Sequence, residues 1–230
     1  YYQDILKDAA EFNLLVNFHG ATLPRGMQRT FPNHMTSEAV KGFEFITFGQ
    51  ETADLEATHS AMLPFTRNLF DPMDFTPMVL GDIPKIERRT SNGFQLALPV
   101  LFYSGIQHLV TTPEQMQAVP EYVREYLRHL PGQWDESRYL DGFPGKYVVI
   151  ARRAAECWYV AGINAEPQVK ELKLDLSFIA QRKGRLIMDG KAPRTFEHLP
   201  VSAEETNLTV SPGAGFIMIF DPHSETSNDQ

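Results

Sequence analysis

The spacing of apolar residues changes at about residue 132, and the two parts predict different kinds of structure. In the first part, Ile5, Leu6, Ala9 and Phe12 recur at the spacing of one helix face, and an apolar run at 14–18 follows directly. A helix that leads into a short buried strand is typical of a parallel α/β sheet. The beginning of the chain therefore predicts an α/β fold.

Further segments of the first part have helical patterns. Residues 92–110 are strongly apolar and predict a helix that Pro99 kinks, and residues 113–129 predict an amphipathic helix. Residues 38–48 fit either one short helix or an approach to a strand. A Pro-Gly pair at 131–132 ends this part.

The second part consists of short β-type runs separated by turns that contain Gly and Pro. Leu172, Leu174 and Leu176 alternate with charged residues, which is the period of a half-buried strand. We predict an antiparallel β-sandwich over about 133–222 and a polar tail at 224–230 that frays. The β-type runs on which this rests are 146–151, 158–163, 169–176 and 215–220.

The predicted fold class is α/β followed by all-β, with one domain at 1–132 and a second at 133–230. A length of 230 residues allows two domains of ordinary size. The chain opens with Tyr1 and Tyr2 in what the pattern predicts to be the middle of a helix. We therefore expect it to be a fragment of a longer protein.

Composition and charge exclude several classes of function. The chain has 21 Lys and Arg against 29 Asp and Glu, a net charge of -8, which argues against nucleic-acid binding. No apolar run approaches the roughly 20 residues that a membrane-spanning helix needs, so we expect a soluble protein. Cys157 is the only cysteine and forms neither an internal disulfide nor a zinc site by itself, so we interpret it as structural.

Familiar catalytic patterns are missing from the sequence. It contains no phosphate-binding P-loop, no dinucleotide-binding glycine pattern and no nucleophile elbow. His19 and Gly20 follow the predicted strand at 14–18, where parallel α/β folds place their functional loops.

Two glutamates, Glu38 and Glu44, stand further along the same rim. Six residues advance an ideal helix by about 600°, so these carboxylates do not share a helix face. They converge if the backbone turns at Gly42. Otherwise they are two exposed glutamates on a solvated loop.

The rim carries a specific series of motifs. They are His19-Gly20-Ala21, then Pro24-x-Gly26-x-x-Arg29-Thr30-Phe31-Pro32-Asn33, then Glu38-x-x-x-Gly42-x-Glu44. Two later segments continue the series, Pro64-Phe65-Thr66-Arg67-Asn68 and Asp71-Pro72-Met73-Asp74-Phe75-Thr76-Pro77. Together they closely resemble the catalytic barrel of glycoside hydrolase family 97. The resemblance spans about residues 1–220.

The resemblance implies a fold and partners. Family members combine an N-terminal β-sandwich, a (β/α)8 barrel and a C-terminal β domain, so this chain would hold the second half of the barrel and the C-terminal domain. That domain would have a role in oligomerisation. Parallel strands at an open edge expose unpaired backbone. We therefore expect residues 1–132 to be covered by another chain, as in a homo-oligomer, or by the remainder of the protein.

The resemblance also implies roles for individual residues. Glu44 would be the general acid/base, Glu38 a calcium ligand, and Glu44 would lie near or on the same Ca²⁺. Carboxylate oxygens are the ligands that this ion prefers. His19 is a plausible partner of a sugar hydroxyl, and a hydrogen-bonded His at a strand end is an equal alternative. Arg29 and Asp74 would order the loops rather than react.

Gly20 separates the two mechanisms that the resemblance implies. Inverting family members have a Glu after the His, as general base and calcium ligand, whereas retaining members have Gly and use an Asp nucleophile, here expected upstream of Tyr1. We therefore expect part of a retaining, exo-acting α-galactosidase that acts on α-linked galactosides or glucosides, inactive as this fragment alone. An inverting α-glucosidase and a non-catalytic carbohydrate-binding or oligomerisation module remain alternatives. The family implies a periplasmic or secreted bacterial protein.

Overall fold

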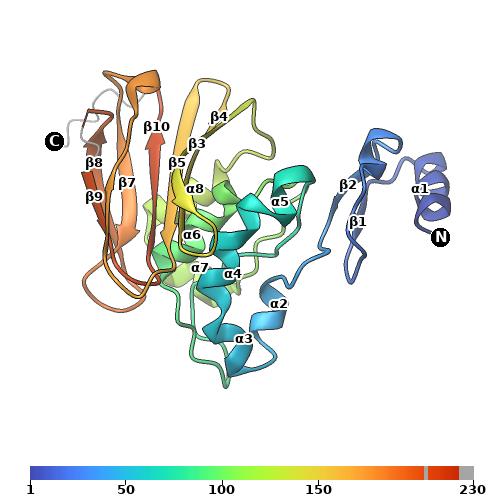
Figure 1. Ribbon diagram of the computed structural model, residues 1–230, viewed down its shortest axis with the longest axis horizontal. Helices are drawn as coiled ribbons and strands as arrows, with labels where there is room; N and C mark the ends of the chain where they lie inside the picture. The colour runs from blue at the N-terminus through green and yellow to red at the C-terminus, as the bar shows by residue number, and fades with distance from the viewer. Residues whose placement is uncertain (205–206, 223–230) are drawn as a thin grey trace.

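The computed structural model describes residues 1–204 and 207–222. The polar tail predicted to fray lies outside these residues. Figure 1 shows a body of helices packed on a large sheet, from which the first elements of the chain project as an arm. No helix in the described ranges combines the length and the apolar character needed to cross a membrane.

The arm and the helical layer contain short elements. In chain order they are α1 (Tyr2–Glu11), β1 (Val16–Phe18), η1 (Met27–Arg29), β2 (His34–Ser37), α2 (Phe43–Ile46), α3 (Gln50–Asp54), α4 (Glu56–Met62), η2 (Leu63–Phe65), α5 (Arg67–Phe70), α6 (Asn92–Leu101), α7 (Pro113–Ala118) and α8 (Glu121–Arg128). The predicted helix at the start of the chain is present as α1. The predicted strand is present as β1, but it is shorter than the run 14–18 and only half-buried, because Leu14 and Leu15 before it are exposed.

Consecutive extended segments lie side by side in this part. β1 pairs with β2 in parallel, and a parallel bridge joins Ser37 at the end of β2 to Met73. The Met73 amide then donates to the Tyr103 carbonyl at 2.9 Å. Parallel strands bring their carboxyl ends to one edge, so the residues after β1, β2 and Met73 meet there. This open arc is compatible with part of a barrel, and a closed barrel remains a prediction.

The remaining strands form two antiparallel sheets. They are β3 (Glu136–Phe143), β4 (Tyr147–Ala154), β5 (Cys157–Asn164), β6 (Lys170–Lys173), β7 (Lys183–Asp189), β8 (Phe196–Ser202), β9 (Asn207–Val210) and β10 (Gly215–Phe220), with the turn η3 (Ser177–Ile179) after β6. Six strands pair in the order β3-β4-β5-β10-β7-β8, and β6 pairs with β9. All of these pairings are antiparallel, as the sequence predicts.

The large sheet has an apolar core on each face. One core joins the sheet to α6, all ten residues of which are buried, and the other contains the three leucines of the alternating run at 172–176. The core with α6 contains Phe94 and Leu98 together with Val148 and Ile217. It therefore crosses the boundary predicted after residue 132, and the helical layer and the sheet stabilise each other through shared apolar contacts.

Two helix predictions were too long. The helix predicted over 92–110 ends at Leu101. Phe102 has an extended backbone, and the carbonyl of the next residue, Tyr103, accepts from the Met73 amide. Close packing fixes this segment, because a Cβ on Gly105 would lie 2.4 Å from the Met35 carbonyl oxygen. The helix predicted over 113–129 divides into α7 and α8, since Pro120 holds the preceding Val119 in an extended conformation.

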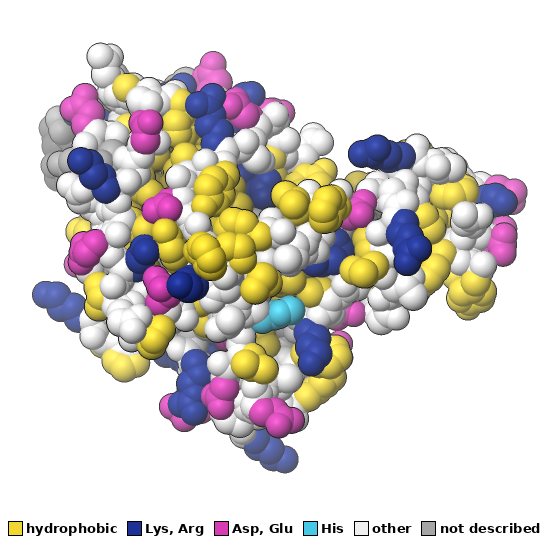
Figure 2. All heavy atoms as spheres, viewed as in Figure 1, with side chains coloured by type: hydrophobic (Ala, Val, Ile, Leu, Met, Phe, Trp, Pro, Cys, Tyr) yellow, Lys and Arg dark blue, Asp and Glu magenta, His cyan; other side chains and the backbone are white. Residues whose placement is uncertain are grey.

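Large apolar side chains remain exposed on the arm and on the short helices that follow it. They include Phe12, Leu14, Leu15, Phe48, Leu69 and Phe70. Figure 2 shows apolar side chains gathered near the middle of the body and along the arm. Contiguous exposed apolar surface usually marks an interaction site, so the expectation that residues 1–132 are covered stays open as a prediction.

Candidate functional site

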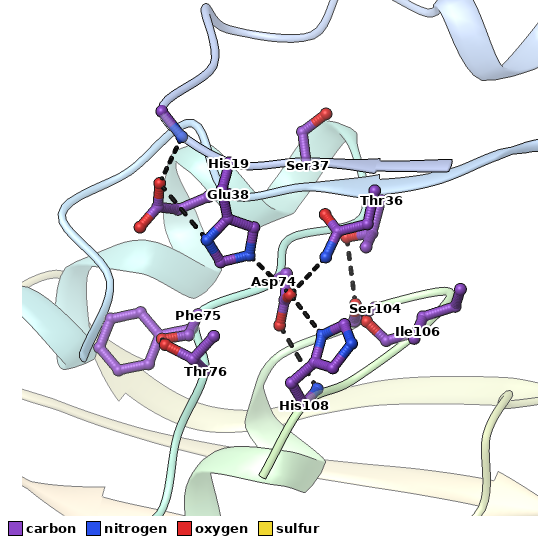
Figure 3. A network of polar contacts seen from close by, with 12 residues as sticks. His19, Thr36, Ser37, Glu38, Asp74, Phe75, Thr76, Ser104, Ile106 and His108 are labelled. Carbon is purple, nitrogen blue, oxygen red and sulfur yellow. Dashed lines mark hydrogen bonds and ion pairs between the residues drawn. The ribbon is translucent and has the colours of Figure 1, made fainter. Parts of the chain in front are cut away.

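Asp74 is the centre of a polar network at the common edge of the extended segments. Its carboxylate is fully buried, and its Oδ2 accepts hydrogen bonds from Asn17 Nδ2 at 2.6 Å, His19 Nε2 at 2.8 Å and His108 Nδ1 at 2.6 Å (Figure 3). Burial by itself raises the pKa of Asp74, but the hydrogen bonds from His19, His108 and Asn17 outweigh burial and hold the pKa below its usual value. Asp74 is therefore an anion that joins three segments of the chain, at 17–19, 74 and 108.

The ionised carboxylate determines which nitrogen of each imidazole carries a proton. An aspartate anion only accepts hydrogen bonds, so His19 donates from Nε2–H and His108 donates from Nδ1–H. The two rings approach Asp74 from different sides (Figure 3), and their side chains remain 40% and 55% exposed. Each ring is thus fixed at its inner nitrogen and open to solvent elsewhere.

Glu38 is the second buried carboxylate of the network. It is 6% exposed, its Oε2 accepts the Gly20 backbone N–H at 2.8 Å, and the same oxygen lies 3.8 Å from His19 Nδ1. Gly20 has φ +60°, a conformation that favours glycine, and open space surrounds the position where its Cβ would be. The structure therefore brings together three of the predicted site residues, His19, Gly20 and Glu38.

Glu44 occupies a different environment, in the first turn of α2. Its side chain is exposed and has no hydrogen bond or ion pair within the described part of the chain. α2 begins after Gly42, where a Cβ would lie 3.1 Å from the Phe75 carbonyl oxygen and 3.2 Å from Glu38 Oε1. The close approach at Gly42 thus packs the start of α2 against the Glu38 carboxylate, although no contact joins the two carboxylates themselves.

Arg67 connects the segments that carry Glu38 and Asp74. Its Nη2 donates to the carbonyl oxygens of Ser37 and Pro72, each at 2.9 Å, and of Glu38 at 3.4 Å, while its Nη1 donates to Asp71 O at 3.0 Å. Burial lowers the pKa of Arg67, but its guanidinium remains a cation at neutral pH. One side chain thereby holds the end of β2 beside the loop that leads to Asp74.

Replacing Arg67 with Met is expected to lower the free energy of unfolding by about 2–3 kcal/mol, because the change leaves partly buried carbonyl oxygens without their charged donor. Urea unfolding followed by circular dichroism measures the difference. The exposed Arg25, changed in the same way to Met, is the matched control and should unfold within about 0.5 kcal/mol of the unchanged protein. Equal stabilities of the two variants would contradict the role of Arg67.

The described residues offer donor atoms of the right kind for calcium, but too few of them to complete a site. Carboxylate oxygens of Glu38 suit a hard cation, and Glu38 Oε1 has no hydrogen-bond donor among the residues that the structure describes. Within residues 1–204 and 207–222, no group of three or more His, Cys, Asp or Glu side chains is placed to hold a metal ion. Glu38 and Glu44 would therefore need ligands from other residues to complete a calcium site.

Sequence reasoning missed His108 and gave Asp74 only a role in ordering loops. Asp74 stands in the motif quoted above, directly after the residue that bridges to β2. His108 follows the extended segment at 102–104, which the sequence pattern assigned to a helix. The available signal was a histidine a few residues after an apolar segment. It was missed because the whole of 92–110 was assigned to one helix.

Comparison with known protein families gives two matches. A model described as glycoside hydrolase 97 matches residues 1–40, and a model described as glycosyl-hydrolase 97 C-terminal, oligomerisation, matches residues 133–221, together more than half of the chain. The chain belongs to glycoside hydrolase family 97. The resemblance to family 97 that the sequence motifs indicate is therefore confirmed.

Individual relatives agree with this assignment to family 97. A probable retaining α-galactosidase of Streptomyces bingchenggensis is 43% identical over 72% of this chain and 25% of the relative. A retaining α-galactosidase of Bacteroides thetaiotaomicron is 31% identical over 91% of this chain and 34% of the relative. A crystal structure of a β-arabinopyranosidase superimposes with a TM-score of 0.90 at 36% identity, over 95% of this chain and 36% of that one. The chain spans about a quarter to a third of the length of these proteins.

Proposed function

We propose that the complete gene product is a retaining, exo-acting α-galactosidase. Gly20 is the observation that carries this proposal. At the position where the resemblance implies a general base in inverting members, this chain has no carboxylate, and the backbone N–H of Gly20 donates to Glu38 instead. A retaining mechanism uses one carboxylate as nucleophile and a second as acid/base, with no base needed at this position. The two relatives named as retaining α-galactosidases support the same conclusion.

The proposed reaction is a double displacement in which Glu44 serves twice. In the first step, the Glu44 carboxyl gives its proton to the leaving oxygen as the glycosidic bond breaks, and an aspartate outside this chain forms a bond to the anomeric carbon. In the second step, the Glu44 carboxylate takes a proton from water as the water oxygen replaces the aspartate. The exposed position of Glu44 in the first turn of α2 gives its carboxyl access to both.

His19 and Glu38 would bind rather than react. His19 is held at Nε2 by Asp74, and its exposed ring is available to a sugar hydroxyl. We propose Glu38 and Glu44 as calcium ligands, together with residues outside the described chain. When bound, Ca²⁺ would hold substrate hydroxyls and add positive charge to the site.

A second substrate follows from the similarity to a β-arabinopyranosidase, which is the structural relative with a TM-score of 0.90. A β-L-arabinopyranoside has the ring hydroxyl configuration of an α-D-galactopyranoside and lacks only the hydroxymethyl group at C5. A site that recognises the shared hydroxyls would accept both glycosides. The difference in kcat/KM between them then reports how the site accommodates that hydroxymethyl group.

The experiment follows the anomeric proton by NMR during early hydrolysis of p-nitrophenyl α-galactoside by the complete gene product, with and without EDTA. We expect α-galactose to appear first and EDTA to abolish turnover. β-Galactose first would mean inversion and would overturn the argument from Gly20. A parallel assay with p-nitrophenyl β-L-arabinopyranoside identifies the preferred glycoside.

Absence of turnover on these glycosides and on p-nitrophenyl α-glucoside would favour the non-catalytic alternative. In that case the family's C-terminal domain, described as having a role in oligomerisation, would be the functional part. Light scattering of the complete gene product then measures the oligomeric state. We expect a homo-oligomer in either case.

A further inference from the structure

His108 is a side chain in the Asp74 network to which the proposed reaction gives no role. Its ring is held at Nδ1 by Asp74 Oδ2 and is 55% exposed, and its Nε2 has no hydrogen-bond partner among the described residues. It stands on a different segment from His19, 89 positions later in the chain. Yet both rings are bound by the same carboxylate oxygen, 2.8 Å and 2.6 Å away.

We propose that His108 is a second sugar-binding residue of this site, and that Asp74 is the positioning residue that fixes His108 and His19 for two hydroxyls of one pyranoside. The identity of the sugar, a galactoside or an arabinopyranoside, rests on the proposed function. The pairing of the two imidazoles rests on the geometry of Asp74 alone.

Because Asp74 requires a proton on His108 Nδ1, the outer Nε2 of the neutral ring is a hydrogen-bond acceptor. His108 is therefore suited to a sugar hydroxyl that donates its proton. His19 is bound in the opposite sense, with Nε2–H toward Asp74 and Nδ1 toward Glu38. In the neutral form each ring therefore has an acceptor as its other nitrogen, Nε2 in His108 and Nδ1 in His19. Two acceptors fixed by one carboxylate suit two hydroxyls of one sugar ring that each donate a proton.

The loop that carries His108 is held in place by its own hydrogen bonds. Ser104 Oγ lies 3.1 Å from Thr36 Oγ1 and donates to Ile106 O at 2.5 Å, and Gln107 Nε2 donates to Phe102 O at 3.3 Å. The His108 backbone N–H also donates to Asp74 Oδ1, at 3.4 Å. A ring fixed before the ligand arrives loses little freedom on binding, which favours affinity.

If Asp74 only stabilised the fold, its hydrogen-bond donors should be buried with it. A carboxylate that only stabilises the fold gains most when its donors are buried with it. Here the carboxylate is buried, but both imidazoles have substantial exposed surface. Asp189 provides the structural comparison, because its partners Ser91 Oγ and the Gly93 backbone N–H belong to the start of α6, inside the packed body.

The first test observes the rings directly in the complete gene product, with histidine labelled with ¹⁵N. We expect His108 to show the Nδ1–H form, and its Nε2 resonance to move when galactose or L-arabinose is added. An Asp74→Asn variant should lose the Nδ1–H form of His108, because a neutral amide oxygen does not hold three donors as the anion does. No movement of the His108 Nε2 resonance at saturating concentrations of both sugars overturns the proposal, whatever the activity.

The second test separates binding from chemistry. In His108→Phe we expect kcat/KM to fall about 10- to 100-fold, mostly through a higher KM, and in Asp74→Asn a loss of similar size. The double variant should lose little more than Asp74→Asn alone, because Asp74 acts through the rings. His129→Gln, on the surface after α8, is the matched histidine control and Asp189→Asn the matched carboxylate control, and both should keep KM unchanged.

Failure of this inference differs from failure of the proposed function. If the unchanged protein hydrolyses the glycosides and His108→Phe keeps its KM, the role of His108 is wrong while the proposed function stands. If the unchanged protein is inactive but the His108 Nε2 resonance moves with sugar, the site binds sugar and the proposed reaction is wrong. If Asp74→Asn only lowers Tm, as Asp189→Asn should, then Asp74 is structural.

Discussion

Replacement of Glu44 by Gln is expected to lower kcat of the complete gene product for α-linked galactobiosides by about 10²- to 10⁴-fold. The amide has the shape of the carboxyl group but neither donates the proton to the leaving oxygen nor accepts one from water. The fold should be unaffected, because the Glu44 side chain is exposed and makes no hydrogen bond within the described residues. Steady-state kinetics and thermal unfolding measure the two effects separately.

The dependence on the leaving group sharpens the test of Glu44. With an aryl galactoside, whose phenolate leaves without protonation, the rate of the first step in Glu44→Gln should fall less. Azide, which attacks the anomeric carbon without a general base, should restore turnover by forming α-galactosyl azide. Glu51→Gln, an exposed glutamate in the first turn of the neighbouring α3, is the matched control and should keep full activity. If both variants remain equally active, Glu44 is not the acid/base.

The second large effect is expected at Glu38. Glu38→Gln should raise the calcium concentration for half-maximal activity by at least about tenfold, because the affinity of a calcium site depends on the number of its anionic oxygens. The Gln side chain still offers an oxygen to the Gly20 backbone N–H, so the local fold should survive. The measurement is a calcium titration of turnover after EDTA treatment, together with the rise of Tm on adding calcium.

Glu11→Gln on the exposed face of α1 is the control for Glu38, and it should titrate as the unchanged protein does. Binding of calcium to the folded state alone raises stability, by about 2.7 kcal/mol at a hundred times the dissociation constant. The unchanged protein should therefore melt at a higher temperature with calcium, and Glu38→Gln should show a smaller rise. Full activity of the unchanged protein in EDTA would remove the metal from the proposed function.

Local patterns were sufficient where one segment determines its own structure. The helix face from Ile5 to Phe12 became α1, and the runs predicted at 146–151 and 215–220 became β4 and β10. Residues close in sequence were also found together, because the Gly20 amide meets Glu38 across the neighbouring strands β1 and β2. Prediction failed at Leu101, where an apolar helix pattern continues but the chain becomes a neighbour of Met73.

The sequence by itself determined the family, the antiparallel strands of the second part, and the grouping of His19 and Gly20 at a strand end. These follow from local periodicity and from motifs that each span a short stretch of the chain. Only the tertiary structure decided that Asp74 binds both His19 and His108, which are 55 and 34 residues away. The physical reason is that a buried carboxylate takes its donors from whichever segments pack around it, and the packing of distant segments has no local period to reveal it.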